Sequence, residues 1–187
     1  GDIIKMQTRL IEEADSIPSG KISQDVGQAE KISSIIKAVK DSAAIADQLR
    51  SYLKSTVSEW GADFVKGGVD TEKVIDSRIN QFDSPWFRYF ILYDPRPTLE
   101  KVKCPVLAMD GTLDLQVPAK EDLKEIEEAL QKGGNRDVTI KLMPGLNHLF
   151  QDAKTGSPNE YAQIEETFSP TALGLIGDWI LKNTGQK

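Results

Sequence analysis

The pattern of apolar residues changes abruptly near position 94 of this 187-residue chain, and this change limits the folds open to it. Before that point, apolar residues recur with the 3.6-residue period of an amphipathic helix. After the segment Asp94–Pro97, which contains two prolines, short unbroken apolar runs alternate with helical patterns. The sequence therefore predicts two parts, an all-helical segment over residues 1–93 and an α/β segment over residues 94–187.

The first part contains several helical stretches separated by polar or glycine-bearing breaks, one of them at Gly67-Gly68. The last stretch begins with Ser84 and Pro85, and proline is favoured at the first helical position because its missing N–H has no partner there in any case. Packing is the expected role of most apolar residues in this part. The predicted helices cover residues 3–14, 26–39, 45–60, 71–79 and 85–91.

The second part contains two runs that are typical of buried strands, Pro105–Met109 and Val138–Leu142. Strands of a parallel sheet are apolar throughout because helices cover both of their faces. Each run is followed by an amphipathic helical pattern, which gives the order strand, helix, strand, helix of an open parallel sheet. Two strands do not form a stable sheet alone, so we expect the remaining strands to come from elsewhere. The two predicted helices cover residues 120–132 and 170–180.

Two chemically active side chains follow these predicted strands. Asp114 lies four residues after Asp110, and His148, the only histidine, lies 34 residues further on. The carboxyl ends of parallel strands share one edge of a sheet, so we expect the two side chains to meet there. An acid and a histidine in this order suit a serine hydrolase, in which the carboxylate orients the imidazole. Taken singly, Asp114 could shape a turn and His148 could be a packing residue; taken together, they favour catalysis.

The composition excludes several classes of function. The net charge of −6 and the scattered cations argue against nucleic-acid binding, which needs a basic surface. No apolar run approaches the roughly 18 residues of a membrane span. A single histidine and a single cysteine leave too few ligands for a metal site in the usual spacings, and they permit no intrachain disulfide. We expect no cofactor, and we expect Cys104 to be buried.

Several motifs of the second part resemble those of a known family. Residues 84–180 are similar to the C-terminal segment of bacterial α/β-hydrolase esterases with a helical cap, related to the dienelactone-hydrolase and prolyl-oligopeptidase-like branches. Residues 1 to about 80 resemble, more loosely, the helical insertion of that group. The resemblance implies that Asp114 is the triad acid and His148 the general base. The segments that carry the resemblance are Ser84–Phe90, Tyr93–Pro95, Lys103–Ala108, Asp114–Pro118, Leu142–Gln151, Thr155-Gly156 and Ile164–Thr167.

The family's nucleophile is missing from this sequence. It lies in a Gly-x-Ser-x-Gly turn between a strand and a helix, and no such turn occurs here. We therefore expect the chain to be the C-terminal part of an α/β-hydrolase, two parallel strands with flanking helices preceded by a helical cap. The serine would lie upstream of it, and the isolated chain would be inactive.

The expected activity is serine-dependent hydrolysis of a small-molecule carboxylic ester. A peptidase or thioesterase using the same triad is an alternative, as is a noncatalytic helical module that binds a partner protein. Trp86 and Phe87 would line the substrate pocket, although core packing explains them equally well. The segment Gln151–Glu160 is expected to be an exposed loop, either a flap over the site or a plain surface loop.

Two expectations concern the environment of the chain. A bare apolar strand over Val106–Met109 invites pairing, so we expect self-association, such as a homodimer formed through the exposed sheet edge. We also expect a soluble bacterial protein, with cytoplasm and periplasm both left open.

Overall fold

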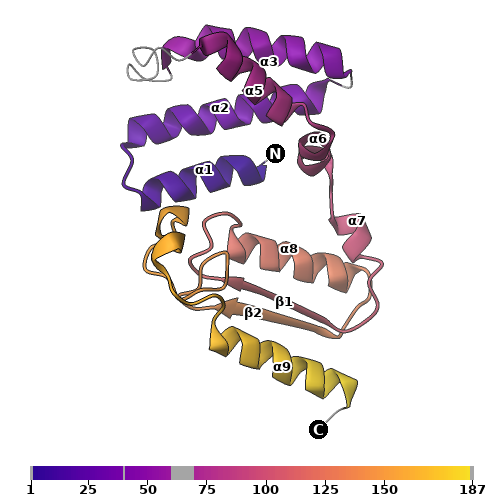
Figure 1. Cartoon of the computed structure of the whole chain (residues 1–187). Helices are drawn as coiled ribbons and strands as arrows, with labels where there is room; N and C mark the ends of the chain where they lie inside the picture. Colours follow the sequence, from indigo (N-terminus) through magenta and orange to yellow (C-terminus); the bar gives the residue numbers. More distant parts are fainter. Residues whose placement is uncertain (1, 40, 60–69, 186–187) are drawn as a thin grey trace. The chain divides into compact units, whose positions relative to one another are not determined.

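The computed structural model describes residues 2–39, 41–59 and 70–185. It divides into two compact units, which are coloured along the chain in Figure 1. The first unit comprises Gly27–Tyr93, and the second combines Asp2–Val26 with Asp94–Lys187. The predicted end of the third helix at Trp60 and the predicted break at Gly67-Gly68 lie outside the described residues.

The first unit is helical, and side-chain caps fix where its helices begin. Asp41 accepts a hydrogen bond from the N–H of Ala44 at the start of α3, and Asp70 accepts one from Lys73 at the start of α5. Ser84 caps α6, where Pro85 takes the first helical position as predicted. Such caps satisfy N–H groups that have no partner within the helix. The elements are the part of α2 (Ser19–Ala38) from Gly27 onward, α3 (Ser42–Thr56), η1 (Val57–Glu59), α5 (Thr71–Phe82) and α6 (Pro85–Leu92).

The core of this unit consists almost entirely of isoleucine and leucine, at the positions that the helical period marks. Helices α3 and α5 pack against each other, and Lys54 of α3 forms an ion pair of 2.8 Å with Glu72 of α5. Exposed pairs of this kind contribute little to stability, so burial of the aliphatic side chains holds the helices together. The buried core residues are Ile32, Ile35, Ile36, Ile45, Leu49, Leu53, Ile75, Ile79 and Ile91.

The second unit is built around two parallel strands, β1 (Val106–Gly111) and β2 (Val138–Met143). Their register pairs Val106 with Val138 and Gly111 with Met143. Helices α8 (Ala119–Lys132) and α9 (Pro170–Thr184) cover opposite faces of the pair (Figure 1). The α/β arrangement of two parallel strands with flanking helices is therefore confirmed.

Packing on the α9 face joins the ends of both strands to that helix. Met143, Leu146 and Ala172 form a buried cluster, and Met109 and Phe150 pack against it. On the same side, the indole N–H of Trp179 donates to the hydroxyl of Thr139 at 3.1 Å. The closing helix thus fixes the loop that follows β2, which is the loop that carries His148.

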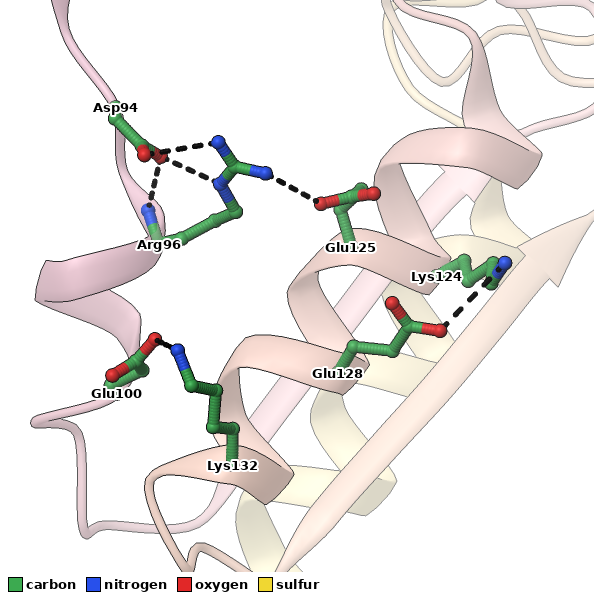
Figure 2. Close-up of polar contacts among 7 residues, drawn as sticks. All are labelled: Asp94, Arg96, Glu100, Lys124, Glu125, Glu128 and Lys132. Atoms are coloured by element: carbon green, nitrogen blue, oxygen red, sulfur yellow. Dashed lines mark hydrogen bonds and ion pairs between the residues drawn. The ribbon is translucent and has the colours of Figure 1, made fainter.

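The short helix α7 (Arg96–Leu99) was not predicted, because the prolines around it suggested a break. Proline is compatible with the first turn of a helix, which makes up most of this element. Figure 2 shows how α7 is joined to α8: Arg96 bonds Asp94 at 2.9 Å and pairs with Glu125 at 3.6 Å, and Lys132 pairs with Glu100 at 2.7 Å. Lys124 and Glu128 form a further pair along α8.

The prediction that Cys104 is buried was wrong, since its side chain is exposed. The apolar run becomes a strand only at Val106, so Cys104 lies in the segment that leads into β1. Asn135 orders this segment: its side-chain amide donates to the carbonyls of Val102 and Cys104 at 3.2 and 2.9 Å. Its side-chain oxygen accepts from the N–H of Asp137, so one buried amide aligns the entry to both strands.

The N-terminal helix α1 (Asp2–Ala14) is joined to the loop that follows His148. Asp15, directly after α1, accepts hydrogen bonds from the hydroxyl of Ser157 at 2.6 Å and the amide of Asn159 at 2.7 Å. Part of the predicted loop Gln151–Glu160 belongs to a 3₁₀ helix, η2 (Pro158–Gln163). A buried serine at its start and a carboxylate from α1 hold this segment in place.

Replacing Gly111 with alanine should destabilise the protein by about 2 kcal/mol or more, since the strand end must move. A Cβ atom at Gly111 would lie 2.0 Å from the carbonyl oxygen of Leu146, which is backbone and cannot turn aside. Urea unfolding followed by circular dichroism would measure the loss.

Gly174→Ala is the matched control, because a Cβ atom there meets nothing within 4 Å in the exposed helix α9. This variant should gain about 0.5–1 kcal/mol from helix propensity. Equal stability of the two variants would contradict the close approach at Gly111.

Candidate active site

Backbone pairing continues beyond the ends of the two strands and brings their following loops together. The N–H of Thr112 donates to the carbonyl of Met143 at 2.8 Å, and that of Leu113 donates to Leu146 at 3.0 Å. The hydroxyl of Thr112 accepts from the N–H of Gly145 at 2.8 Å. The loop after β1 therefore lies directly against the loop after β2.

The structure brings Asp114 and His148 together at this edge. Oδ2 of Asp114 lies 2.7 Å from Nδ1 of His148. Oδ1 of the same carboxylate accepts hydrogen bonds from the backbone N–H groups of Gln116 and Val117, both at 2.8 Å. The acid is almost fully buried, with 3% of its side chain exposed, whereas 38% of the histidine side chain is exposed.

This geometry determines which ring nitrogen carries the proton when the imidazole is neutral. An ionised carboxylate can only accept hydrogen bonds, so Nδ1 of His148 must donate to Asp114. The other nitrogen, Nε2, then has a free lone pair and can take a proton. Among the described residues, none bonds Nε2, and the ring is accessible from outside the protein.

The loop that carries His148 is shaped by the buried side chain of Asn147. Its amide oxygen accepts from the N–H groups of Leu149 and Gln151 at 2.9 and 3.0 Å, and its amide nitrogen donates to the side chain of Gln151 at 3.0 Å. Gln151 in turn donates to the carbonyl of Glu166 at 2.8 Å. The backbone on both sides of His148 is thus held by amides that make several hydrogen bonds each.

A second buried acid, Asp110, lies at the end of β1 beside Asp114. Burial raises the pKa of Asp110 to about 7, and the charge of Asp114 and a hydrogen bond with its carboxyl add to this rise. The backbone N–H of Gly111, which donates to Asp110 at 2.7 Å, opposes it. Burial and the charge of Asp114 also raise the pKa of Asp122, on α8.

A polar link joins the acid loop to η2. The side-chain amide of Gln116 donates to the hydroxyl of Tyr161 at 3.0 Å, while the backbone N–H of Gln116 bonds Asp114. Burial raises the pKa of Tyr161, and the charge of Asp114 contributes to the rise although the bond from Gln116 opposes it. The tyrosine therefore stays protonated at neutral pH.

The other two predicted site residues lie on α6, in the helical unit. Trp86 is 70% exposed and stacks on Phe90 with ring centroids 5.4 Å apart, and Phe87 is half-buried against Phe82 at 5.5 Å. Tyr89 and Tyr93 form a second stacked pair on the same helix. These aromatic rings contact one another within their own unit.

No group of three or more histidine, cysteine or acidic side chains within residues 2–39, 41–59 and 70–185 is arranged to hold a metal ion. None of the helices described is both long and apolar enough to cross a bilayer.

Comparison with known families finds a match to the prolyl oligopeptidase family over residues 37–171. The matched segment is most of the chain. This chain belongs to the prolyl oligopeptidase family. The prediction of an α/β-hydrolase of the prolyl-oligopeptidase-like branch is therefore confirmed. Comparison with curated proteins finds no match, and comparison with solved structures finds none either.

Prolyl oligopeptidase family members are serine hydrolases with an α/β-hydrolase-type fold. The match includes both strands, the two loops that carry Asp114 and His148, and most of the helical unit. The buried acid and the accessible histidine thus occupy one edge of the sheet in a chain of a serine hydrolase family.

Three features of the site were not predicted from the sequence. No role was predicted for Asp110, although a carboxylate at the end of an apolar strand indicates a buried acid. Asn147 directly precedes His148, and its polar side chain within an apolar loop was the available signal. The hydrogen bond between Asp15 and Ser157 joins residues 142 positions apart, and no local sequence pattern predicts it.

Asp110→Asn should stabilise the folded protein at pH 8 more than at pH 5. The pKa of Asp110 is raised from its ordinary value of 3.8 to about 7, so the folded state binds this proton more tightly than the unfolded chain does. Its contribution to the free energy of unfolding is therefore fully present below about pH 4 and is lost as the pH rises through about 7. Asparagine carries no charge at either pH, so we expect the free energy of unfolding to rise by on the order of 1 kcal/mol at pH 8.

Urea unfolding at both pH values tests this, with Asp178→Asn as the control. Asp178 is exposed on α9, so its replacement removes the same charge without relieving burial. A stability difference for Asp110→Asn that does not change between pH 5 and pH 8 would refute the raised pKa.

Proposed function

We propose that this chain supplies the acid and the base of a Ser-His-Asp triad that hydrolyses carboxylic esters, with Asp114 as the acid and His148 as the general base. The observation that carries the proposal is the 2.7 Å contact between a buried carboxylate and an accessible imidazole. Membership of a serine hydrolase family supports it. So does the sequence resemblance to cap-bearing esterases, which favours esters as the substrates.

The geometry suits the two roles in a specific way. With Nδ1–H held by Asp114, Nε2 of His148 accepts the proton of a serine hydroxyl as the oxygen attacks the ester carbonyl. The imidazolium that forms is stabilised by the adjacent carboxylate, and it then gives the proton to the leaving alcohol. Asp114 keeps its orientation because two backbone amides hold its other oxygen.

The serine itself would come from a segment that precedes this sequence in the whole protein. No Gly-x-Ser-x-Gly turn occurs here. Ser157, the serine nearest in sequence to His148, is buried and donates its hydroxyl proton to Asp15, so it is a poor candidate for attack. The chain by itself is therefore inactive under this proposal.

Peptide hydrolysis is the second candidate, and the family match favours it. The same triad cleaves esters, thioesters and amides, because each passes through a tetrahedral intermediate. Comparison of matched ester, thioester and peptide substrates in the whole protein separates these activities. A noncatalytic role in binding a partner protein would instead leave function intact after His148→Ala.

The helical segment over residues 1–93 would act as a cap or lid above the strand ends. Lids of this kind exclude water and shape the pocket for the substrate. Trp86 and Phe87 would contribute to the pocket wall, a role that the high exposure of Trp86 permits. Half-buried apolar residues of β1 would also allow a homodimer to form through the edge of the sheet.

The purified chain should hydrolyse p-nitrophenyl esters no faster than its His148→Ala variant, since both lack the nucleophile. In a longer product that adds the preceding segment, hydrolysis should appear, and His148→Ala or Asp114→Asn should reduce kcat/KM by about 10³-fold or more. Initial rates with p-nitrophenyl acetate and butyrate measure both effects.

Asp178→Asn in the longer product controls for loss of a negative charge at an exposed site. Histidine-dependent hydrolysis by the chain alone would contradict the proposal that its nucleophile is missing. Full activity of the longer His148→Ala product would contradict the proposed triad.

The chain should also self-associate with rising concentration. Residues Val106–Met109 border an apolar pocket of about 550 Å³ together with Leu123 and Ile176. Sedimentation velocity should show a shift from monomer to dimer that Leu107→Lys abolishes. Leu181→Lys, at an exposed apolar position on α9, should leave the shift unchanged. A monomer at all concentrations would contradict the edge-pairing model.

A further inference from the structure

A pocket of about 420 Å³ lies beside the acid loop within the second unit. Its walls come from α1, from the segment Thr112–Leu115 after β1, from the start of α8 and from Leu142 of β2. Asp114 itself lines the pocket. A ligand bound there would therefore lie next to the residue that orients His148. The volume falls within the roughly 300–1,000 Å³ of small-molecule sites, at their lower end.

Most of the pocket wall is apolar and aliphatic. Met6 and Leu10 contribute from α1, which the bonds of Asp15 to Ser157 and Asn159 tie to this unit. Leu115 and Leu142 contribute from the opposite side. Such a surface binds hydrocarbon by excluding water, and no aromatic ring is among the described residues that line it.

Two cations, Arg9 and Lys120, line the same pocket and are both exposed. Neither forms an ion pair with an acid in the part of the chain that the structure describes. Arg50, Arg96 and Lys132, by contrast, each pair with a carboxylate. Two acids, Glu121 and Asp114, also line the pocket, so the formal charges of its lining cancel. The Asp114 side chain is only 3% exposed and is already bonded to two backbone amides and His148. The charged side chains open to a ligand are therefore Arg9, Lys120 and Glu121, two positive and one negative.

We propose that this pocket binds an aliphatic chain that ends in a carboxylate, with the hydrocarbon against Met6, Leu10 and Leu115 and the carboxylate at Arg9 and Lys120. Identification of this ligand as the acyl part of the substrate, a half-ester of a short dicarboxylic acid, rests on the proposed function. The binding itself does not. The free carboxylate of such a substrate would lie at the cationic end, and its ester bond would extend out of the pocket beyond Asp114, toward Nε2 of His148.

Methyl NMR on the purified chain tests the binding. The chain has three methionines, and only Met6 lines the pocket, so Met109 and Met143 serve as internal controls in a sample labelled at the methionine methyl groups. Titration with hexanoate should shift the Met6 signal alone. Hexanamide has the same hydrocarbon without the charge, and it should bind about tenfold more weakly, which corresponds to about 1.4 kcal/mol.

Variants separate the charge from the fold. Arg9→Gln with Lys120→Gln should lower hexanoate affinity about tenfold and leave hexanamide binding unchanged. Lys101→Gln with Arg136→Gln removes the same charge at exposed positions outside the pocket and should have no effect. Arg9→Glu with Lys120→Glu should reverse the preference, so that hexylammonium binds more tightly than hexanoate.

The proposal is overturned if hexanoate and hexanamide bind wild type equally, if Met6 does not shift, or if the Arg9/Lys120 variants bind as wild type does. His148→Ala should bind hexanoate normally, because the histidine does not line the pocket. Loss of the triad function with intact hexanoate binding would refute the proposed catalysis alone. Triad-dependent hydrolysis with no hexanoate binding would refute the pocket assignment alone.

Discussion

The parallel pairing of β1 with β2 is the constraint on which the candidate active site depends. The register ends with Gly111 opposite Met143, and hydrogen bonds from Thr112 and Leu113 continue it into the loops. The backbone at Leu146 approaches Gly111 so closely that no side chain fits between them. The 2.7 Å distance between Asp114 and His148 is therefore set by backbone geometry on both sides. An ion pair with a partly exposed partner contributes only about 0–1 kcal/mol and could not assemble the two loops by itself.

The two buried acids near this edge have different hydrogen-bond partners. Asp114 accepts from two backbone N–H groups and contacts the histidine. Asp110 has one backbone donor and a charged neighbour, and burial raises its pKa to about 7. A protonated Asp110 donates to Asp114 and so adds a further hydrogen bond to the carboxylate.

The sequence predicted the parts of the fold that follow from local pattern. Helical period and unbroken apolar runs located α1, α3, α5, α6, α8, α9 and both strands, and the strand-end rule brought Asp114 and His148 to one place. The failures have physical causes. Helix α7 was not predicted because Pro95 and Pro97 suggested a break. Cys104 was predicted to be buried because it precedes an apolar run, but it lies in the exposed segment just before the strand begins. The role of Asn147 depends on hydrogen bonds to a loop that exists only in the folded chain, and the link from Asp15 to Ser157 depends on a tertiary contact.

In the second unit, hydrogen bonds link one wall of the proposed carboxylate pocket to the loop of Asp114. Helix α1 forms one wall of the cationic pocket and is bonded through Asp15 to the start of η2. Tyr161 of η2 accepts from Gln116, whose backbone N–H holds Asp114, and the segment Thr112–Leu115 forms another wall of the same pocket. A ligand that separates α1 from this segment must strain either the bonds of Asp15 or the loop of Asp114. A ligand that fits between them without strain would leave the carboxylate where the histidine needs it, because the backbone that forms the pocket wall also orients the acid.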